Sequence, residues 1–207
     1  MLQSLIKKQR CNANTNFKKG ETMESVKQII RDVPDFPKEG IIFKDITPLL
    51  GDPVAFQKTI NALKDRYADK PVDAVVGVEA RGFIFASALA YALGTGVVMV
   101  RKPGKLPYKT FQETYSLEYG TDTVEIHQDA LRSGQNIIVI DDVLATGGTL
   151  SATLDLIRKN FKNINILEAV FLIELDFLKG REKLKDTPIY SMIHLSLIHI
   201  SEPTRPY

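Results

Sequence analysis

Two adjacent acids and a glycine-rich turn form the part of the sequence best suited to chemistry. Asp141 and Asp142 directly follow an apolar run at residues 137–140, and residues 145–149 read ATGGT. Two carboxylates at the end of a buried strand are costly unless they meet hydrogen-bond donors. Ribose hydroxyls would supply those donors, and the carboxylates would also favour positive charge developing at the anomeric carbon of the sugar.

The turn itself has the composition of a phosphate-binding loop. Gly147 and Gly148 let backbone N–H groups approach an anion, and a helix predicted to begin at Gly148 points its positive dipole end the same way. Thr146 and Thr149 add hydroxyl donors, and Ala145 precedes them. No lysine follows Gly148, so the loop is not the GxxxxGK[ST] nucleotide motif. A TGGT turn alone would fit a solvated acidic cap equally well, but the whole string predicts a site for a ribose 5-phosphate.

The elements around this loop alternate between short apolar runs and helical stretches. Strands are predicted at residues 74–78, 97–100, 136–140 and 166–174, with helices at 83–93 and 148–159. Continuous apolar strands separated by helices indicate an α/β fold, a doubly wound parallel sheet with flanking helices. Ligands of such sheets bind beyond the carboxyl ends of the strands, so we expect the site in the loops at 79–82, 101–122 and 141–149.

The segment before the sheet is punctuated by proline and glycine. A short helix is predicted at residues 24–31, and a short strand at 41–43 lies within a loop. Asp52 and Pro53 are an N-cap and a first-turn proline for the next helix. The apolar face of that helix consists of Phe56, Ile60, Leu63 and Tyr67.

Composition excludes several classes of protein. Of 207 residues, 44% are hydrophobic and 25% charged, as in an average globular protein, and no apolar run approaches the length of a membrane span. Cys11 is the only cysteine and can form no internal disulfide, so we expect a cytoplasmic protein. The net charge of +2 comes from residues 1–22, and we therefore expect no nucleic-acid partner and no membrane.

Both ends of the chain look foreign to the fold. Residues 1–22 lack apolar periodicity and are predicted to be disordered or a mis-annotated leader before a true start at Met23; a genuine flexible tail is the alternative. Residues 195–207 resemble a translated sequencing adapter and are predicted to be a non-native tail. We assign no functional role to His194 or His199, and the functional domain is placed at residues 23–194.

Nearly all of residues 23–194 resembles the adenine phosphoribosyltransferases of the type I phosphoribosyltransferase family. The similar segments are FPKEGIIFKDITPLL, EARGFIF, RKPGKLPY, YSLEYG, VIDDVLATGGT and FLKGREKL. The resemblance implies the type I fold with a small N-terminal hood and a flexible catalytic lid. It also implies transfer of ribose 5-phosphate from phosphoribosyl pyrophosphate (PRPP) to adenine, giving AMP and diphosphate, in a homodimer with a contact near the Arg81 loop.

The same resemblance assigns the pyrophosphate end of PRPP to basic residues. Arg81 and the backbone N–H groups near it would receive the pyrophosphate; an ion pair of Arg81 with Glu79 or Asp141 is the alternative. The basic run that follows the strand at 97–100 would neutralise the departing pyrophosphate together with Mg²⁺, although such a run taken alone is usually a solvated surface. That run contains Arg101, Lys102 and Lys105. We find no metal-ligand spacing in the sequence and expect substrate oxygens and water to hold the Mg²⁺.

Residues 103–123 are polar and weakly patterned, as expected of a lid that excludes water from a reactive sugar cation. The resemblance makes Glu118 the general acid/base and gives Tyr119 a supporting role in lid closure. An ordinary exposed loop glutamate is the alternative for Glu118. His127, in an alternating segment, is interpreted as a surface strand residue.

The absence of an acid at one position of the phosphate loop favours adenine over 6-oxopurines as the substrate. Related enzymes for hypoxanthine, guanine and xanthine carry an extra acid in the phosphate loop, where this sequence has Ala145. Ile42, Phe43 and Lys44 resemble the family's adenine hood, with a core position as the alternative for Phe43. Two other functions stay open: a 6-oxopurine phosphoribosyltransferase and a non-catalytic PRPP-sensing regulator, although the latter normally adds a nucleic-acid-reading module.

Overall fold

The computed structural model describes residues 21–116, 120–184 and 186–196 and separates into two compact units that meet in sequence between Lys58 and Thr59. None of the helices in these ranges is long and apolar enough to cross a membrane. Each unit is described by itself.

The first unit is a small assembly of two helices and a hairpin, with the start of a third helix. It contains α2 (Glu21–Lys27), β1 (Arg31–Pro34), β2 (Ile42–Asp45), α3 (Thr47–Gly51) and the first turns of α4 (Pro53–Tyr67). The strand predicted at 41–43 is confirmed as β2, but its antiparallel partner β1 was missed. The helix predicted at 24–31 was wrong at both ends, because α2 ends at Lys27 and β1 follows. Asp52 caps α4 as predicted, accepting the N–H groups of Val54 and Ala55 at 2.8 and 2.9 Å.

The second unit is built on a five-stranded parallel sheet, as predicted. Its order is β4-β3-β7-β8-β9, and the strands are β3 (Ala74–Val78), β4 (Gly96–Val100), β7 (Asn136–Leu144), β8 (Asn165–Leu175) and β9 (Ile189–Leu195). From β3 the chain moves outward to β4, whereas from β7 it moves the opposite way to β8 and β9. The strand order therefore reverses between β3 and β7, which is the position where such sheets bind ligands.

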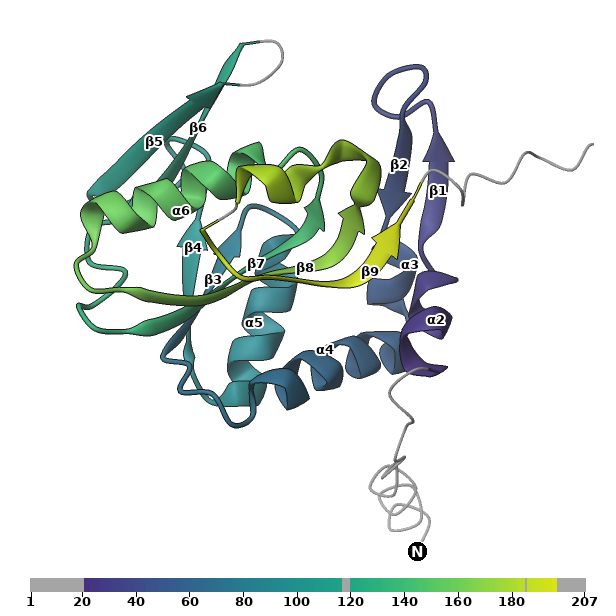
Figure 1. Cartoon of the computed structure of the whole chain (residues 1–207), viewed down its shortest axis with the longest axis horizontal. Coiled ribbons are helices and arrows are strands. Elements are labelled where there is room, and N and C mark those ends of the chain that lie inside the picture. The colour runs from purple at the N-terminus through teal and green to yellow at the C-terminus, as the bar shows by residue number, and fades with distance from the viewer. Residues whose placement is uncertain (1–20, 117–119, 185, 197–207) are drawn as a thin grey trace, which may run out of the picture. The chain divides into compact units, whose positions relative to one another are not determined.

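Helices cover both faces of this sheet, which confirms the doubly wound prediction. Figure 1 shows α5 (Gly82–Leu93) on one side and α6 (Gly148–Asn160) on the other. All five residues of β3 are buried, as a strand covered on both faces requires. The chain passes from β3 through α5 to its neighbour β4, and from β7 through α6 to its neighbour β8, while β3 and β7 pair with each other.

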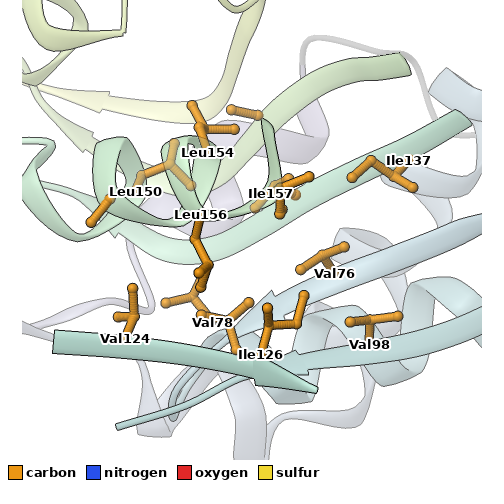
Figure 2. Packing of buried hydrophobic residues seen from close by; sticks show 14 of the residues in the cluster. Val76, Val78, Val98, Val124, Ile126, Ile137, Leu150, Leu154, Leu156 and Ile157 are labelled. Atoms are coloured by element: carbon orange, nitrogen blue, oxygen red, sulfur yellow. The ribbon is translucent and has the colours of Figure 1, made fainter. Parts of the chain in front are cut away.

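The core on the α6 side is a layer of aliphatic side chains. In Figure 2, Leu150, Leu154 and Ile157 of α6 lie over Val76 of β3 and Ile137 of β7. Leu150, Leu154 and Ile157 follow the spacing of one helix face, and Ala152 and Leu156 of α6 belong to the same core cluster. The layer fixes the helix that begins at the glycine-rich loop.

The segment predicted to be a weakly patterned lid is partly regular. It contains β5 (Thr110–Ser116) and β6 (Thr121–His127), paired antiparallel, and Figure 1 shows this hairpin beside α6. Val124 and Ile126 of β6 join the aliphatic layer of Figure 2, so the base of the hairpin belongs to the core. His127 lies in β6, as predicted for a strand residue.

The last strand among the described residues is β9, which the sequence argument did not predict. This edge strand includes Leu195, the first residue of the predicted non-native tail, which pairs with Leu175. Residues 1–20 and 197–207 lie outside the described residues, so the two predicted foreign ends stay predictions.

Candidate functional site

Two loops meet where the strand order reverses. One comprises residues 79–82 after β3, and the other follows β7. A Cβ placed on Gly82 would lie 2.9 Å from the carbonyl oxygen of Ile140 and 3.0 Å from Asp141 Oδ1, closer than side chains tolerate. The absence of a side chain at Gly82 is therefore what lets this loop touch the last residues of β7, which brings together two predicted parts of the PRPP site.

The acids lie inside β7 and not beyond its end, which corrects the predicted strand boundary. Pairing of β7 with β3 stops at Gly77 and Ile140, whereas pairing with β8 continues to Leu144 and Glu174. The strand is thus held on one side only along its last four residues, and the other side is open to the loop at 79–82.

Asp142 is buried and has an oxygen without a donor in the described part of the chain, whereas Asp141 is half-buried and accepts the Asp142 N–H at 2.8 Å. Asp142 is 5% exposed, and within the described residues its Oδ2 atom has no hydrogen-bond donor. Arg81 Nε lies 2.7 Å from this atom, as an ion pair whose alignment is not that of a hydrogen bond. Arg81 therefore pairs with Asp142, the neighbour of the predicted partner Asp141, and its charge also opposes the burial that raises the pKa of Asp141. A buried acceptor of this kind is suited to a hydroxyl or cation brought by a ligand.

The pKa values of Asp141 and Asp142 also favour a ligand that brings hydrogen-bond donors or a cation. Burial, together with the neighbouring charge of Asp142, raises the pKa of the Asp141 carboxyl well above its usual range. Burial also raises the pKa of Asp142, and the charge of Arg81 opposes that rise. Keeping both carboxylates ionised is therefore unfavourable, and donors or a cation from a ligand would relieve the cost.

The glycine-rich loop turns sharply into α6. Gly147 has a φ of +77°, and α6 begins at Gly148, as predicted. The first N–H groups of an α-helix have no intrahelical acceptor, so those of α6 are directed at the loop. A left-handed residue followed by a helix N-terminus is an anion-binding arrangement.

A second segment supports this loop from behind. Gly180 begins the second of two short 3₁₀ turns, Asp176–Leu178 and Gly180–Lys183, and a Cβ on it would lie 2.2 Å from the carbonyl oxygen of Ala145. A Cβ on Gly147 would lie 2.6 Å from the carbonyl oxygen of Gly180. The two backbones are thus in direct contact. Arg181 anchors the supporting turn through two hydrogen bonds of 2.6 and 2.7 Å to the buried carboxylate of Glu174.

The predicted pyrophosphate cations are already paired with acids of the protein. Glu79 accepts the backbone N–H of Lys102 at 2.8 Å and forms ion pairs with Arg101 and Lys105. Burial would raise the pKa of Glu79, but the hydrogen bonds from Lys105 and Lys102 outweigh it and lower that pKa. The Lys102 ammonium contacts Asp122. This run is therefore not a freely solvated surface, since each cation has a carboxylate partner.

Sequence reasoning missed two hairpin residues, Tyr115, which reaches the glycine-rich loop, and Asp122, which links Tyr115 to Lys102. The hydroxyl of Tyr115 donates to Asp122 Oδ2 at 3.0 Å and lies 3.0 Å from the hydroxyl of Thr149. Burial would raise the pKa of Asp122, but the hydrogen bonds of Lys102, the Thr123 N–H and Tyr115 hold it below its usual value. The alternating pattern of residues 121–127 could have indicated the strand, but not these partners.

The remaining predicted residues lie in other parts of the chain. Glu118 and Tyr119 lie outside the described residues. Ile42, Phe43 and Lys44 form part of β2 in the first unit. There Phe43 is half-buried, with its ring centroid 5.2 Å from that of Phe36.

Lys44 is also engaged inside that unit. Its ammonium lies 2.7 Å from both carboxylate oxygens of Asp32 on the paired strand. The side chain of Lys44 is therefore held across the hairpin.

One group of potential metal ligands was not expected from sequence spacing. Glu174, Asp176 and His194 offer ligand atoms within 4.8 Å of one another, because Glu174 and His194 are opposite each other on β8 and β9. Glu174 is already engaged by Arg181 and by Ser191, whose hydroxyl donates at 2.5 Å. The group therefore behaves as a hydrogen-bonded network behind the glycine-rich loop.

Comparison with known proteins identifies the class first. A model of the phosphoribosyl transferase domain family matches residues 50–203, which include the loops at the strand reversal. The fold and the loops therefore define a phosphoribosyltransferase.

Individual relatives narrow the class. Adenine phosphoribosyltransferase of Geobacter metallireducens is 57% identical over 171 residues, covering 83% of this chain and 99% of the relative. The structure of adenine phosphoribosyltransferase from Thermoanaerobacter pseudethanolicus superposes with a TM-score of 0.80 at 48% identity, covering 84% of this chain and 99% of that one. The enzyme of Saccharomyces cerevisiae, complexed with an imino-altritol bisphosphate and adenine, gives a TM-score of 0.78 at 43% identity, with coverages of 83% and 98%. The chain belongs to the adenine phosphoribosyltransferase family.

Proposed function

We propose that this protein transfers the ribose 5-phosphate group of PRPP to adenine, giving AMP and diphosphate. The observation that carries the proposal is the contact of the Gly82 loop with the end of β7, where Asp142 Oδ2 is buried without a hydrogen-bond donor among the described residues. Membership of the adenine phosphoribosyltransferase family supports the choice of base.

The sugar and its 5-phosphate are assigned to β7 and the loop after it. Asp141 and Asp142 would accept the ribose hydroxyls, which supply the donors that these buried carboxylates need. Ionised carboxylates beside the sugar would also stabilise positive charge on the ring as the bond to pyrophosphate breaks. The 5-phosphate would accept N–H groups from the loop and the α6 N-terminus, with hydroxyls from the loop threonines. The loop residues proposed for this role are Ala145, Thr146, Gly147, Gly148 and Thr149.

The pyrophosphate end is assigned to the loop after β3 and the basic run after β4. Arg81 would exchange its ion pair with Asp142 for the pyrophosphate, and Arg101, Lys102 and Lys105 would stabilise the charge of the leaving group. The carboxylates of Glu79 and Asp122 hold three of these cations in the empty protein, so the charges are positioned before the substrate arrives.

Magnesium fits this site through oxygen chemistry. It is a hard cation that prefers oxygen ligands and retains water, and the buried, donor-free Oδ2 of Asp142 is an oxygen of that kind. We expect PRPP oxygens and water to hold most of its coordination shell near Asp141 and Asp142. When bound, it would neutralise charge on the pyrophosphate.

Base chemistry is assigned to the lid and the first unit. Glu118 would act as general acid/base at the purine, with Tyr119 supporting closure of the lid, and Ile42, Phe43 and Lys44 would read the adenine. Ala145 stands where 6-oxopurine enzymes carry an acid, which supports adenine over hypoxanthine and guanine. The hairpin would also exclude water from the sugar cation.

A homodimer is part of the proposal. Ile84 and Tyr91 of α5 are 40% and 91% exposed, and Val97 and Met99 of β4, at the sheet edge, are 41% and 45% exposed. Because Val98 belongs to the core on the α6 side, Val97 and Met99 face the α5 side. An apolar surface beginning two residues after Gly82 supports a subunit contact near the Arg81 loop. A cytoplasmic location is also retained, since the single cysteine forms no internal disulfide.

The test is turnover of PRPP and Mg²⁺ with each purine base. We expect AMP from adenine, with far less nucleotide from hypoxanthine or guanine. Preference for a 6-oxopurine would remove the assignment of the base, and no turnover with any base would favour the PRPP sensor. Asp142→Asn should lose the activity and the exposed Asp129→Asn should keep it, which excludes a contaminating enzyme as the source.

A further inference from the structure

A continuous chain of contacts joins the two ends of the proposed PRPP site through the hairpin. Lys102 contacts Asp122 Oδ2, the same oxygen accepts the Tyr115 hydroxyl at 3.0 Å, and that hydroxyl lies 3.0 Å from the hydroxyl of Thr149. The ring of Tyr115 also lies between these ends, with the Lys102 ammonium 5.9 Å from its centroid. Lys102 belongs to the proposed pyrophosphate end and Thr149 to the proposed 5-phosphate end.

The number of protons on each group determines which atom donates in each hydrogen bond of this series of contacts. An ionised carboxylate only accepts, so Lys102 and Tyr115 both donate to Asp122. A tyrosine hydroxyl has a single proton, and here Asp122 receives it. The remaining bond must therefore be donated by Thr149 to the oxygen of Tyr115.

This direction conflicts with the bound state. A phosphate oxygen only accepts, so Thr149 can bind the 5-phosphate only by turning its proton away from Tyr115. Likewise, Lys102 can pair with pyrophosphate only by leaving or sharing with Asp122. The hairpin thus presents a hydroxyl oxygen and a carboxylate to the same donors that PRPP needs.

We propose that Tyr115 and Asp122 act as an internal stand-in for the two anionic ends of PRPP, holding Thr149 and Lys102 in the empty enzyme and lowering its affinity until substrate displaces them. This inference rests on the proposed function, because it uses the 5-phosphate and pyrophosphate ends assigned there. Tyr115 and Asp122 are positioning residues in this scheme. Each competes with one end of the ligand.

The proposal predicts that removing the polar groups of Tyr115 and Asp122 tightens ligand binding. If the hairpin residues only supported the fold, or contacted the substrate favourably, removing their polar groups would weaken binding. If they compete with substrate, removal tightens it. Tyr115→Phe should lower the Kd of ribose 5-phosphate by about threefold to tenfold, the usual scale of one net hydrogen bond. Asp122→Asn should lower the Kd of magnesium pyrophosphate by about tenfold, because it removes a negative charge beside a polyanion.

The experiment is calorimetric titration of ribose 5-phosphate and of magnesium pyrophosphate into the wild type and the two variants. Thr114→Val is the matched control, since it removes the 2.9 Å hydroxyl pair with Thr123 from the same hairpin and touches neither end of the chain. Both Kd values should stay within about twofold of wild type in this control. A melting curve for each protein establishes that it is folded.

Two sets of outcomes are distinguishable. If the wild type binds neither ligand, the proposed function fails and this inference fails with it. If the wild type binds both, but ribose 5-phosphate is not tightened in Tyr115→Phe or pyrophosphate is not tightened in Asp122→Asn, only the stand-in is overturned. If one variant does not fold, the direction of the change in Kd measured with the other variant decides whether the proposal holds.

Discussion

Replacing Gly180 by alanine tests how the glycine-rich loop is held. The new Cβ would lie 2.2 Å from the carbonyl oxygen of Ala145 and 2.9 Å from Leu144 Cδ1, whereas ordinary contact begins at 3.4 Å. The oxygen that must give way is backbone of the loop itself. Gly180 cannot retreat easily, because the adjacent Arg181 is anchored by the buried Glu174.

The loop must therefore shift by about 1 Å, and a misplacement of this size at a substrate-positioning element costs on the order of 100-fold in rate. We expect kcat/KM for PRPP to fall by about that factor while KM for adenine changes by less than about twofold. Overpacking should also destabilise the fold by about 1 to 3 kcal/mol, which lowers Tm by about 2 to 12 °C for a domain of this size.

The assay is steady-state AMP formation with either substrate varied, run well below the Tm of the variant. Gly96→Ala is the control, since a Cβ there has no neighbour within 4 Å and its φ is not positive. Its Tm should stay within about 2 °C of wild type. A Gly180→Ala protein with wild-type kcat/KM for PRPP would refute the claim that the Gly180 backbone holds the loop in place.

Three further predictions follow from single side chains. Asp141→Asn should raise Tm by a few degrees, and by more as pH rises above about 4, because a carboxyl whose pKa is raised by folding costs stability as pH increases from its ordinary pKa toward the raised one; PRPP activity should meanwhile fall about 100-fold. Glu168→Ala removes a carboxylate held by Arg66 at 2.6 and 2.7 Å and should lower stability by about 2 kcal/mol at pH 7, a value reduced by the exposure of Arg66. Since the pKa of Glu168 is lowered, that loss should shrink below about pH 4 in thermal melts, and a constant loss would contradict it. Glu118→Leu should lower kcat by about 100-fold or more in the same AMP assay, and near wild-type turnover would remove Glu118 as the acid/base.

Much of the sheet could be predicted because its strands are buried on both faces. Runs such as residues 74–78 are apolar throughout, and glycine marks the turn into the helix at 82 and at 148. These two signals predict the doubly wound fold and the position of the loops at the carboxyl edge of the sheet. The extent of β7 could not be read in the same way, since its last residues include two acids and are paired on one side only.

The missed strands share a different cause. β5 has no fully buried residue, and β1 spans four residues that are largely exposed, so neither carries the apolar run by which the sheet strands were found. β9 is an edge strand whose last residue was attributed to a foreign tail. Their pairing depends on partners distant in sequence.

The site was predicted as segments, not as contacts. The acids and glycines of residues 141–149 have types that suggest their chemistry in any context. The roles of Tyr115 and Asp122 depend on Thr149 and Lys102, which are 34 and 20 residues away in sequence, and no local pattern contains that information. Gly180 likewise has meaning only through the carbonyl of Ala145.

The most direct test of the central claim is a crystal structure of the protein with ribose 5-phosphate and magnesium pyrophosphate. We expect the phosphate at the N–H groups of residues 146–149, the ribose hydroxyls on Asp141 and Asp142, and the pyrophosphate beside Arg81. A 5-phosphate bound away from the Gly147 turn, or ribose hydroxyls that contact neither acid, would contradict it.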